Sequence, residues 1–460
     1  MAIAPFKKFY SLRSTGDHDA RNWAWKNTDF GFWGSETVSR RCRESICACM
    51  TGYPSPTFSL DLTRGERILE VAMRYALKSQ LRKVKQTPWA LPLAIMLVLS
   101  IPVRGNPLSY TLTVVAKTGD TIGGKTLTGF KLPSFGVNPP AINASGRVAF
   151  YATYSEGAFV GEGIFTSTSL VLKTGDAVNG QTLEGISFVP AINDNGTVIV
   201  HGLLSSQKLA VLSSTTLLAE SGDVIGGQKL TNIGVPAVNN KGAVAFVGSF
   251  SGGTGIFTQT ALLAKSRELI AGQELASFGP PVINDQGMVA FQGWLSGDAG
   301  TAIFTPAAPI VKVGDTICGR RLTDLFFGRA LNANGTVAFV GVFPGGTGVF
   351  TQKDLLLQAG DTIGGQKLTT FGYPVINDAG IVAFFATYEG GAGIFTQSSL
   401  IAKTGDMIAW KTLTDLGQPV INRSGAVVFA GLFSDGSSAI ILARPILGSA
   451  ESRTSCSHHE

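Results

Sequence analysis

The residues best suited to chemistry are acidic side chains that recur along the sequence. They occupy the fourth position of a motif close to K-T-G-D-x-I-G-G-x-x-L. Gathered on one face, such carboxylates could hold a cation or a hydroxyl-rich ligand such as a glycan. The alternative, which we favour, is that each caps its own turn, because Asp in a T-G-D sequence readily accepts hydrogen bonds from nearby backbone. The seven candidates for ligand binding are Asp120, Asp176, Asp223, Glu268, Asp315, Asp361 and Asp406.

Other catalytic or metal-binding patterns are missing from the sequence. His201 is the only histidine within the repeats, and a structural role fits it better than a place in a triad. The sequence contains no G-x-S-x-G, H-E-x-x-H, Walker or C-x-x-C motif. The C-x4-C-x-C spacing of Cys42, Cys47 and Cys49 does not match a zinc site. We therefore expect no catalytic residue, no metal site and no cofactor.

A second motif, N-x-x-G followed by a hydrophobic pair, occurs seven times. Successive Asn residues are 50, 46, 45, 48, 45 and 45 positions apart. A period of 40–50 residues with several strand signals indicates a propeller or a solenoid. Asn and Gly at this spacing favour a tight hairpin turn, so we assign them a structural role. These turn residues are Asn143, Gly146, Asn193, Gly196, Asn239, Gly242, Asn284, Gly287, Asn332, Gly335, Asn377, Gly380, Asn422 and Gly425.

Each repeat contains four short strand candidates. In the sixth repeat they cover residues 374–377, 381–388, 393–397 and 400–403. The second of these, IVAFFATY, is almost entirely apolar, which indicates a strand with both faces covered. Four antiparallel strands in about 46 residues are typical of one β-propeller blade. The sequence thus predicts an all-β, seven-bladed β-propeller.

The ends of the repeat array predict how the ring closes. The first K-T-G-D copy, with the strand candidate before it, precedes every N-x-x-G copy, whereas no such strand follows the last repeat. We therefore predict that residues 111–117 pair with residues 439–442 and complete the seventh blade. A ring closed in this way has no exposed sheet edge of the kind that a linear array leaves.

The N-x-x-G-x-x-A-F motif resembles that of the bacterial choice-of-anchor tandem-repeat NxxGxxAF proteins. The copies that begin at Asn143, Asn239, Asn284, Asn332 and Asn377 match every position, whereas those at Asn193 and Asn422 differ in the hydrophobic pair. The likeness covers about residues 111–442. It implies an exported, surface or extracellular protein of unassigned activity, and it provides no catalytic residues.

The region before the repeats has a different character. Residues 1–105 carry 16 Lys and Arg against 8 Asp and Glu, whereas the remainder carries 21 against 23. Residues 89–103 form an apolar run after a basic stretch, which is typical of a signal peptide or a membrane anchor. We predict a low-order leader at 1–72, not translated if Met73 is the true start, a signal or anchor at 73–105, the propeller at 106–445 and a flexible tail at 446–460.

Two classes of function agree with these features. The first is a secreted or cell-surface, non-catalytic binding or scaffold module for a glycan, an envelope component or a protein. The alternative is an extracellular hydrolase or lyase that acts on polysaccharide through central carboxylates. The nearly equal repeats favour the first class, since an enzyme should carry unusual insertions in one or two blades. We expect a monomer that binds no nucleic acid, because the repeats lack a basic stripe, and that touches a membrane only through residues 89–103.

Overall fold

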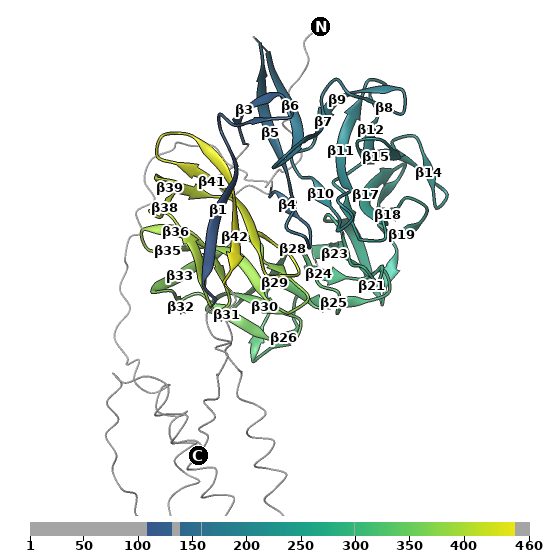
Figure 1. Cartoon of the computed structure of the whole chain (residues 1–460). Helices are drawn as coiled ribbons and strands as arrows, with labels where there is room; N and C mark the ends of the chain where they lie inside the picture. Colours follow the sequence, from purple (N-terminus) through teal and green to yellow (C-terminus); the bar gives the residue numbers. More distant parts are fainter. Residues whose placement is uncertain (1–107, 131–138, 158, 299, 447–460) are drawn as a thin grey trace, which may run out of the picture. The chain divides into compact units, whose positions relative to one another are not determined.

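The computed structural model describes residues 108–130, 139–157, 159–298 and 300–446. These residues form a seven-bladed β-propeller, which confirms the predicted fold class (Figure 1). The predictions for residues 1–72 and 73–105, for residues 447–460 of the tail and for Cys42, Cys47 and Cys49 lie outside the described residues. Within the described ranges, no helix is long and apolar enough to cross a membrane.

The sixth blade shows the common plan. Its inner strand has two segments, β33 (Gln366–Phe371) and β34 (Val375–Ile376), and both pair with β35 (Val382–Tyr388). β36 (Gly391–Thr396) and the outer strand β37 (Leu400–Lys403) follow. β32 (Thr362–Ile363) forms a short hairpin with β33. The inner strand is thus longer than the sequence predicted, because the end of the K-T-G-D-x-I-G-G-x-x-L motif contributes its first segment.

The remaining blades use the same order. Inner segments are β3 (Lys125–Gly129), β4 (Ala141–Ile142), β9 (Gln181–Ile186), β10 (Ala191–Ile192), β15 (Gln228–Ile233), β16 (Ala237–Val238), β21 (Gln273–Phe278), β22 (Val282–Ile283), β28 (Asp324–Leu331), β39 (Lys411–Leu416) and β40 (Val420–Ile421). Second strands are β5 (Val148–Glu156), β11 (Val198–Leu204), β17 (Val244–Phe250), β23 (Val289–Leu295), β29 (Val337–Phe343) and β41 (Val427–Phe433). Third strands are β6 (Phe159–Thr166), β12 (Leu209–Leu212), β18 (Gly253–Thr258), β24 (Thr301–Phe304), β30 (Gly346–Thr351) and β42 (Ser438–Pro445).

The outer strands and the short hairpins complete the blades. Outer strands are β1 (Tyr110–Lys117), β7 (Leu170–Lys173), β13 (Leu217–Glu220), β19 (Leu262–Lys265), β25 (Pro309–Lys312) and β31 (Leu355–Gln358). Short hairpin strands are β2 (Thr121–Ile122), β8 (Ala177–Val178), β14 (Val224–Ile225), β20 (Leu269–Ile270), β26 (Thr316–Ile317), β27 (Arg320–Arg321) and β38 (Met407–Ile408). A 3-10 turn, η2 (Ser296–Asp298), lies between β23 and β24.

The ring closes as the sequence predicted. β1, the first strand, pairs antiparallel with β42, the last, in the register Thr111↔Arg444 to Lys117↔Ala439. The yellow and dark-blue strands therefore share one sheet in Figure 1. This pairing supplies the outer strand of the seventh blade.

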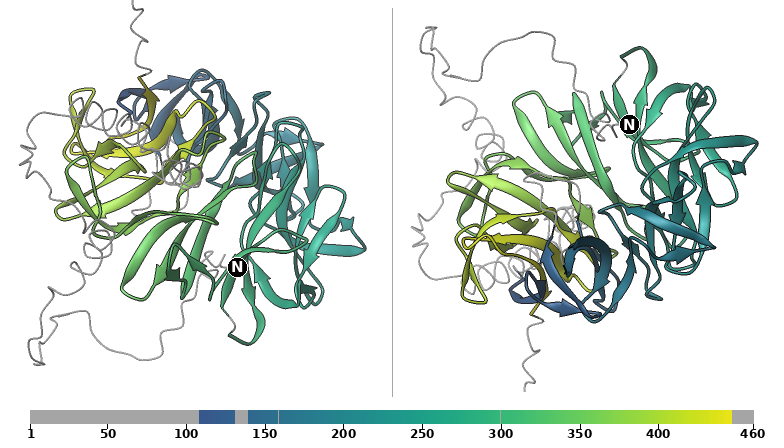
Figure 2. Two further views of the ribbon diagram at one scale, coloured as in Figure 1. Left: turned by 90° about the horizontal axis from the view of Figure 1, so that it is seen from below. Right: turned by 90° about the horizontal axis from the view of Figure 1, so that it is seen from above.

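The hydrophobic core lies between adjacent blades. Each second strand carries two adjacent apolar residues whose side chains point to opposite faces of the sheet. Ala383 and Phe384 are such a pair, and both are fully buried. Phe384 stacks on Phe395 with ring centroids 6.0 Å apart, and Phe339 stacks on Phe350 in the same way at 5.7 Å. Because every blade is covered on both faces, the strands need no polar alternation. Figure 2 shows the blades arranged around the ring from both sides.

Candidate functional site

Each N-x-x-G segment forms a turn at the end of an inner strand. The backbone N–H of the Gly donates to the carbonyl of the Asn at 2.9–3.1 Å, and the Gly has a φ of 78–85°. The Asn Oδ1 accepts the backbone N–H four residues later at 2.8–2.9 Å. Gly is required here because a side chain at positive φ is disfavoured.

The same seven Asn residues also link the blades to one another. Each Nδ2 donates to the backbone carbonyl of the Asn in the next blade at 2.9–3.3 Å. The series returns to its start, because Asn422 donates to Asn143. All seven residues are buried, with 4–6% of their surface exposed. We call this set, Asn143, Asn193, Asn239, Asn284, Asn332, Asn377 and Asn422, the asparagine ring.

The residue that follows each Asn of the ring differs from blade to blade. These axial positions hold Ala144, Asp194, Asn240, Asp285, Ala333, Asp378 and Arg423. Where the next blade offers an amide or a carboxylate, its oxygen accepts the backbone N–H of the preceding axial residue: Ala144 donates to Asp194 at 2.7 Å and Ala333 to Asp378 at 2.8 Å. The turns thereby direct polar side chains from several blades toward one place.

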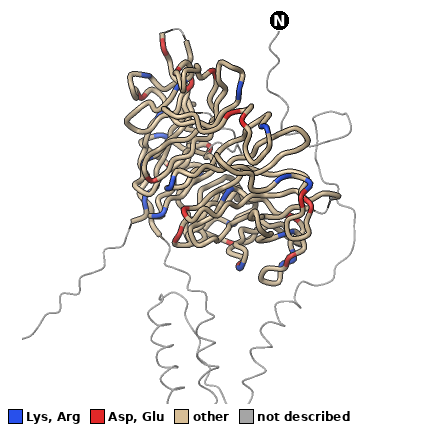
Figure 3. Tube along the Cα trace, turned by 90° about the vertical axis from the view of Figure 1, so that its right-hand side faces the viewer, with Lys and Arg blue, Asp and Glu red and all other residues tan. Residues whose placement is uncertain are grey.

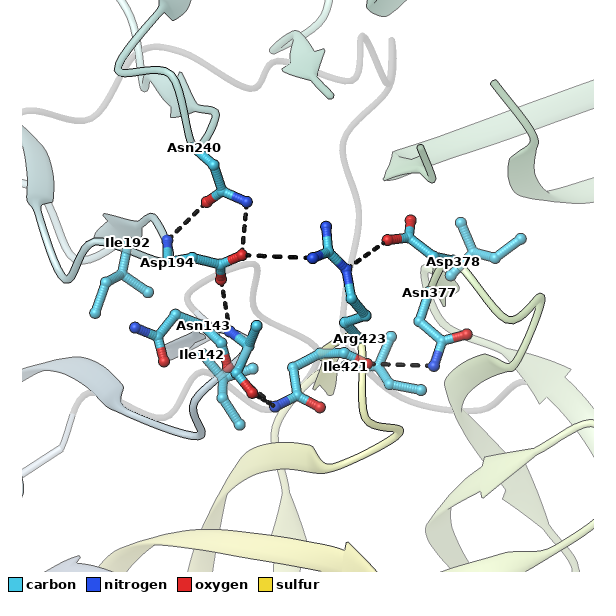
Figure 4. A pocket seen from close by; sticks show the side chains of 12 residues that line it. Ile142, Asn143, Ile192, Asp194, Asn240, Asn377, Asp378, Ile421 and Arg423 are labelled. Atoms are coloured by element: carbon cyan, nitrogen blue, oxygen red, sulfur yellow. Dashed lines mark hydrogen bonds and ion pairs between the residues drawn. The ribbon is translucent and has the colours of Figure 1, made fainter. Parts of the chain in front are cut away.

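Arg423 lies among three carboxylates at the centre of this group. Figure 4 shows two of them, Asp194 and Asp378, on either side of the guanidinium. Its Nε is 2.8 Å from Asp378 Oδ2, and its Nη2 is 3.2 Å from Asp285 Oδ2. Asp194 Oδ2 is more distant, 4.0 Å from Nη1. The hydrogen bond to Asp378 is the main reason that the pKa of Arg423 is raised. About half of the Arg423 side chain, 54%, remains exposed.

Arg423, Asp194 and Asp378 help to line a cavity of about 180 Å³, which we call the axial pocket. Its apolar wall comes from Ile142, Ile192, Ile376 and Ile421. Its polar wall comes from three residues of the asparagine ring and four axial residues: Asn143, Asn377, Asn422, Asp194, Asn240, Asp378 and Arg423. Pockets that enclose a drug-sized molecule have about 300–1,000 Å³. The axial pocket therefore has room for one small group, such as a side chain or a single ring of a larger partner.

The carboxylates of the axial positions are already engaged. Asp194 Oδ2 and Asp285 Oδ2 both accept from Asn240 Nδ2, at 2.6 and 2.7 Å. Their Oδ1 atoms accept backbone N–H groups of Ala144 and Asn240. Because these oxygens already accept hydrogen bonds from amide and backbone donors, the two carboxylates are held in fixed positions, which suits recognition of a ligand by hydrogen bonds.

The seven acidic candidates lie elsewhere, one at the end of each outer strand. The Oδ2 of each Asp accepts the backbone N–H three residues earlier at 2.8–2.9 Å, in Asp120, Asp176, Asp223, Asp315, Asp361 and Asp406. Glu268 instead forms an ion pair with Lys265 at 3.0 Å. In the ranges that the structure describes, no three His, Cys, Asp or Glu side chains form a group able to hold a metal ion. Figure 3 shows acidic and basic residues interspersed along the chain.

His201 lies on β11 and packs between the second and third blades. Burial lowers its pKa, and a hydrogen bond with the backbone of Ile233 offsets this only in part. Its Nε2 has no hydrogen-bond partner among the described residues. Within that part of the chain, no carboxylate or hydroxyl is placed to make His201 a catalytic base.

Sequence reasoning missed the axial positions, including Asp194, Asp285, Asp378 and Arg423. A signal was present, because an alignment of the seven repeats places a charged or amide residue after the motif Asn in five of them. The signal is weak, since the type and even the charge of this residue change from blade to blade, whereas the Asn before it is constant.

The fold and its axial network define a β-propeller whose seven blades are joined by an asparagine ring. The chain belongs to a family of unknown function, DUF7453, whose model matches residues 104–254 and 210–440. No curated protein matches the sequence.

Solved structures that resemble the chain include propellers of several kinds. The WD40 domain of Toxoplasma gondii coronin has 13% identity and a TM-score of 0.37, with 75% of this chain and 90% of that chain covered. The WD40 domain of Doa1 has 11% identity and a TM-score of 0.34, with coverages of 72% and 96%. Virginiamycin B lyase from Staphylococcus aureus has 10% identity and a TM-score of 0.32, with coverages of 74% and 100%. We transfer no function from these proteins.

Proposed function

We propose that this protein is a non-catalytic binding or scaffold module whose partner docks over the axial pocket. The observation that carries the proposal is the axial layer itself. There the repeat stops being uniform, and polar side chains of five blades line one accessible pocket. The recurring Asp and Asn residues, in contrast, are used for turns and for links between blades.

The chemistry of the pocket supports a polar partner. Arg423 offers N–H donors beside the acceptor oxygens of Asp194 and Asp378, so the pocket can both donate and accept hydrogen bonds. Hydroxyl groups of a glycan or a polar side chain of a protein use both kinds of bond. Because the cavity is small, the rest of the partner would lie across the surrounding turns.

We further propose that the module works outside the cytoplasm, on the cell surface or secreted. The basis is the signal-like pattern of residues 73–105 and the resemblance to exported NxxGxxAF repeat proteins. Cell fractionation followed by N-terminal sequencing of the mature chain tests this part. Recovery of the protein only in the cytoplasm with residues 73–105 intact would contradict it.

A glycan array with a parallel polysaccharide degradation assay tests the binding function. We expect the full chain to bind selected glycans without releasing product. Arg423→Ala should weaken binding at least tenfold, whereas Asp361→Asn, a matched change of a charged residue at an outer turn, should not. Absence of binding to every glycan would contradict the glycan form of the proposal and leave a protein partner.

The alternative is an extracellular hydrolase or lyase, and one observation favours keeping it. Three carboxylates, Asp194, Asp285 and Asp378, do lie near the centre of the ring. Product release that is abolished by Asp378→Asn, with the fold intact, would establish this alternative in place of the binding module.

A further inference from the structure

One residue of the inner strands breaks the repeat. Three positions before each Asn of the asparagine ring, six blades have proline: Pro140, Pro190, Pro236, Pro281, Pro374 and Pro419. The fifth blade has Arg329 instead. Among the seven inner strands, Arg329 is therefore the one charged residue at this position.

The backbone around Arg329 is also unusual. Its φ is +71°, a value that disfavours any residue other than glycine. The pairing of β28 with β29 shifts between Phe326 and Ala330, so the fifth blade has one inner strand with a bulge where the inner strands of the other blades are interrupted beside the proline. Strained positions of this kind concentrate at functional sites.

The Arg329 side chain is half-buried, and its guanidinium makes one hydrogen bond among the described residues. Its Nη2 donates to the carbonyl of Pro236 in the third blade at 2.9 Å, so the side chain reaches past the fourth blade on the side of the ring axis. No Asp or Glu among the described residues forms an ion pair with it, although the guanidinium carries five N–H donors. Burial lowers the pKa of Arg329 to about 10, so the side chain is still charged at neutral pH.

A charge that is partly withdrawn from water and has no counter-charge is unfavourable unless something pairs with it. The carboxylates near the ring axis do not supply that pairing, because Asp194, Asp285 and Asp378 already surround Arg423. Arg329 lies four residues before Ala333, the axial residue of the same blade. Four residues of an extended strand span about 13 Å. The two features are therefore separate.

We propose that Arg329 recognises an oxyanion, a carboxylate or a phosphate group, that enters the central channel of the propeller. The planar fork of an arginine matches both groups through paired hydrogen bonds. The ligand would replace water at the free N–H groups while the bond to Pro236 holds the guanidinium in place. This site goes beyond the proposed function and does not depend on the axial pocket.

The test uses the full chain and three probes: inorganic phosphate, acetate and glucuronate, at constant ionic strength and neutral pH. We expect at least one probe to raise the melting temperature and to give a saturable signal in calorimetric titration. A phosphate response without an acetate response identifies a phosphate ligand, and the reverse identifies a carboxylate.

Variants separate recognition from stability. Arg329→Gly suits the positive φ and removes a half-buried, unpaired charge, so it should fold at least as well while losing binding at least tenfold. Arg329→Lys should keep weaker binding, and Arg423→Ala should leave it unchanged. The proposal is overturned if no probe binds at millimolar concentration or if Arg329→Gly binds as the original chain does. Neither result would bear on glycan binding at the axial pocket.

Discussion

The side-chain amide of Asn422 donates a hydrogen bond of 2.9 Å to the backbone carbonyl of Asn143, a residue 279 positions earlier. The bond joins the seventh blade to the first on the inner side of the ring. The pairing of β1 with β42 joins the seventh blade's own sheet on the outer side. The ring is therefore closed at two radii by independent interactions.

Replacement of Asn422 by Ala should destabilise the fold by about 2–4 kcal/mol. The change removes the turn cap, so that the backbone N–H of Ala426 loses its acceptor, and it removes one of the two donors to the carbonyl of Asn143, which keeps only the N–H of Gly146. Urea unfolding measures the difference. Asn334→Ala is the matched control, since Asn334 is exposed and its side chain makes one long bond of 3.4 Å. Equal losses in both variants would mean that the asparagine ring contributes nothing beyond local turn propensity.

Replacement of Asp361 by Ala should cost about 1 kcal/mol, because its Oδ2 accepts the backbone N–H of Gln358. Asp361→Asn keeps a side-chain oxygen and should cost clearly less. Thermal unfolding of both variants checks this. A loss of ligand or cation binding, with stability unchanged, would instead support the alternative that the seven acidic residues together bind a ligand.

Trp410 should be replaceable by Gly with a gain in stability of about 1 kcal/mol. It has a φ of +66° in a hairpin turn where the other six blades have Gly, and 94% of its surface is exposed. Gly removes the backbone strain, which exceeds its own entropic cost. Trp410→Ala, the control, retains the strain and should give no such gain in melting temperature. A less stable Gly variant would show that Trp410 makes a contact in solution.

His201 should make the protein less stable in mild acid. Its folded-state pKa lies below the ordinary 6.5, so the unfolded chain binds the proton more readily. Stability is then fully present above pH 6.5 and falls as the pH drops toward the folded-state pKa. His201→Val, which introduces the residue found at the equivalent position of the third blade, Val247, should reduce this slope in urea unfolding series. An unchanged slope would assign the acid sensitivity to other groups.

Arg423→Ala should lower the melting temperature more at low than at high salt. Without the guanidinium, the nearby carboxylates of Asp285 and Asp378 repel one another, and salt screens this repulsion within about 10 Å at 0.1 M. Scans at low and high ionic strength give the comparison. A loss independent of salt would point to packing of the arginine stem as the main contribution.

The fold could be predicted because repetition reveals it. Seven copies of Asn and Gly at nearly equal steps, with β1 displaced to the front, determine both the number of blades and the closing pair. The first segment of each inner strand, such as β33, was missed because its alternating polar residues resemble the preceding turn more than a strand.

The candidate site was much harder to predict. The turn role of residues such as Asn377 follows from local chemistry, whereas its Nδ2 bond to the next blade depends on how blades pack. Arg423 and Asp285 are 138 positions apart, and only the closed ring brings them within 3.2 Å. Sequence periodicity describes neighbours within a repeat but does not describe which side chains meet on the axis.

The split seventh blade has a consequence for the order in which this protein can form. β1 leaves the ribosome first and its partner β42 among the last of the described strands, with Thr118 and Ser438 separated by 320 residues. Six blades can assemble from neighbouring segments during synthesis, but the first strand must wait, unpaired, for the end of the chain. Such distant pairing is slow, since a long loop has to close before the contact forms. Until then, the waiting edge is exposed to any other strand, and we expect a chaperone to be most useful during that interval.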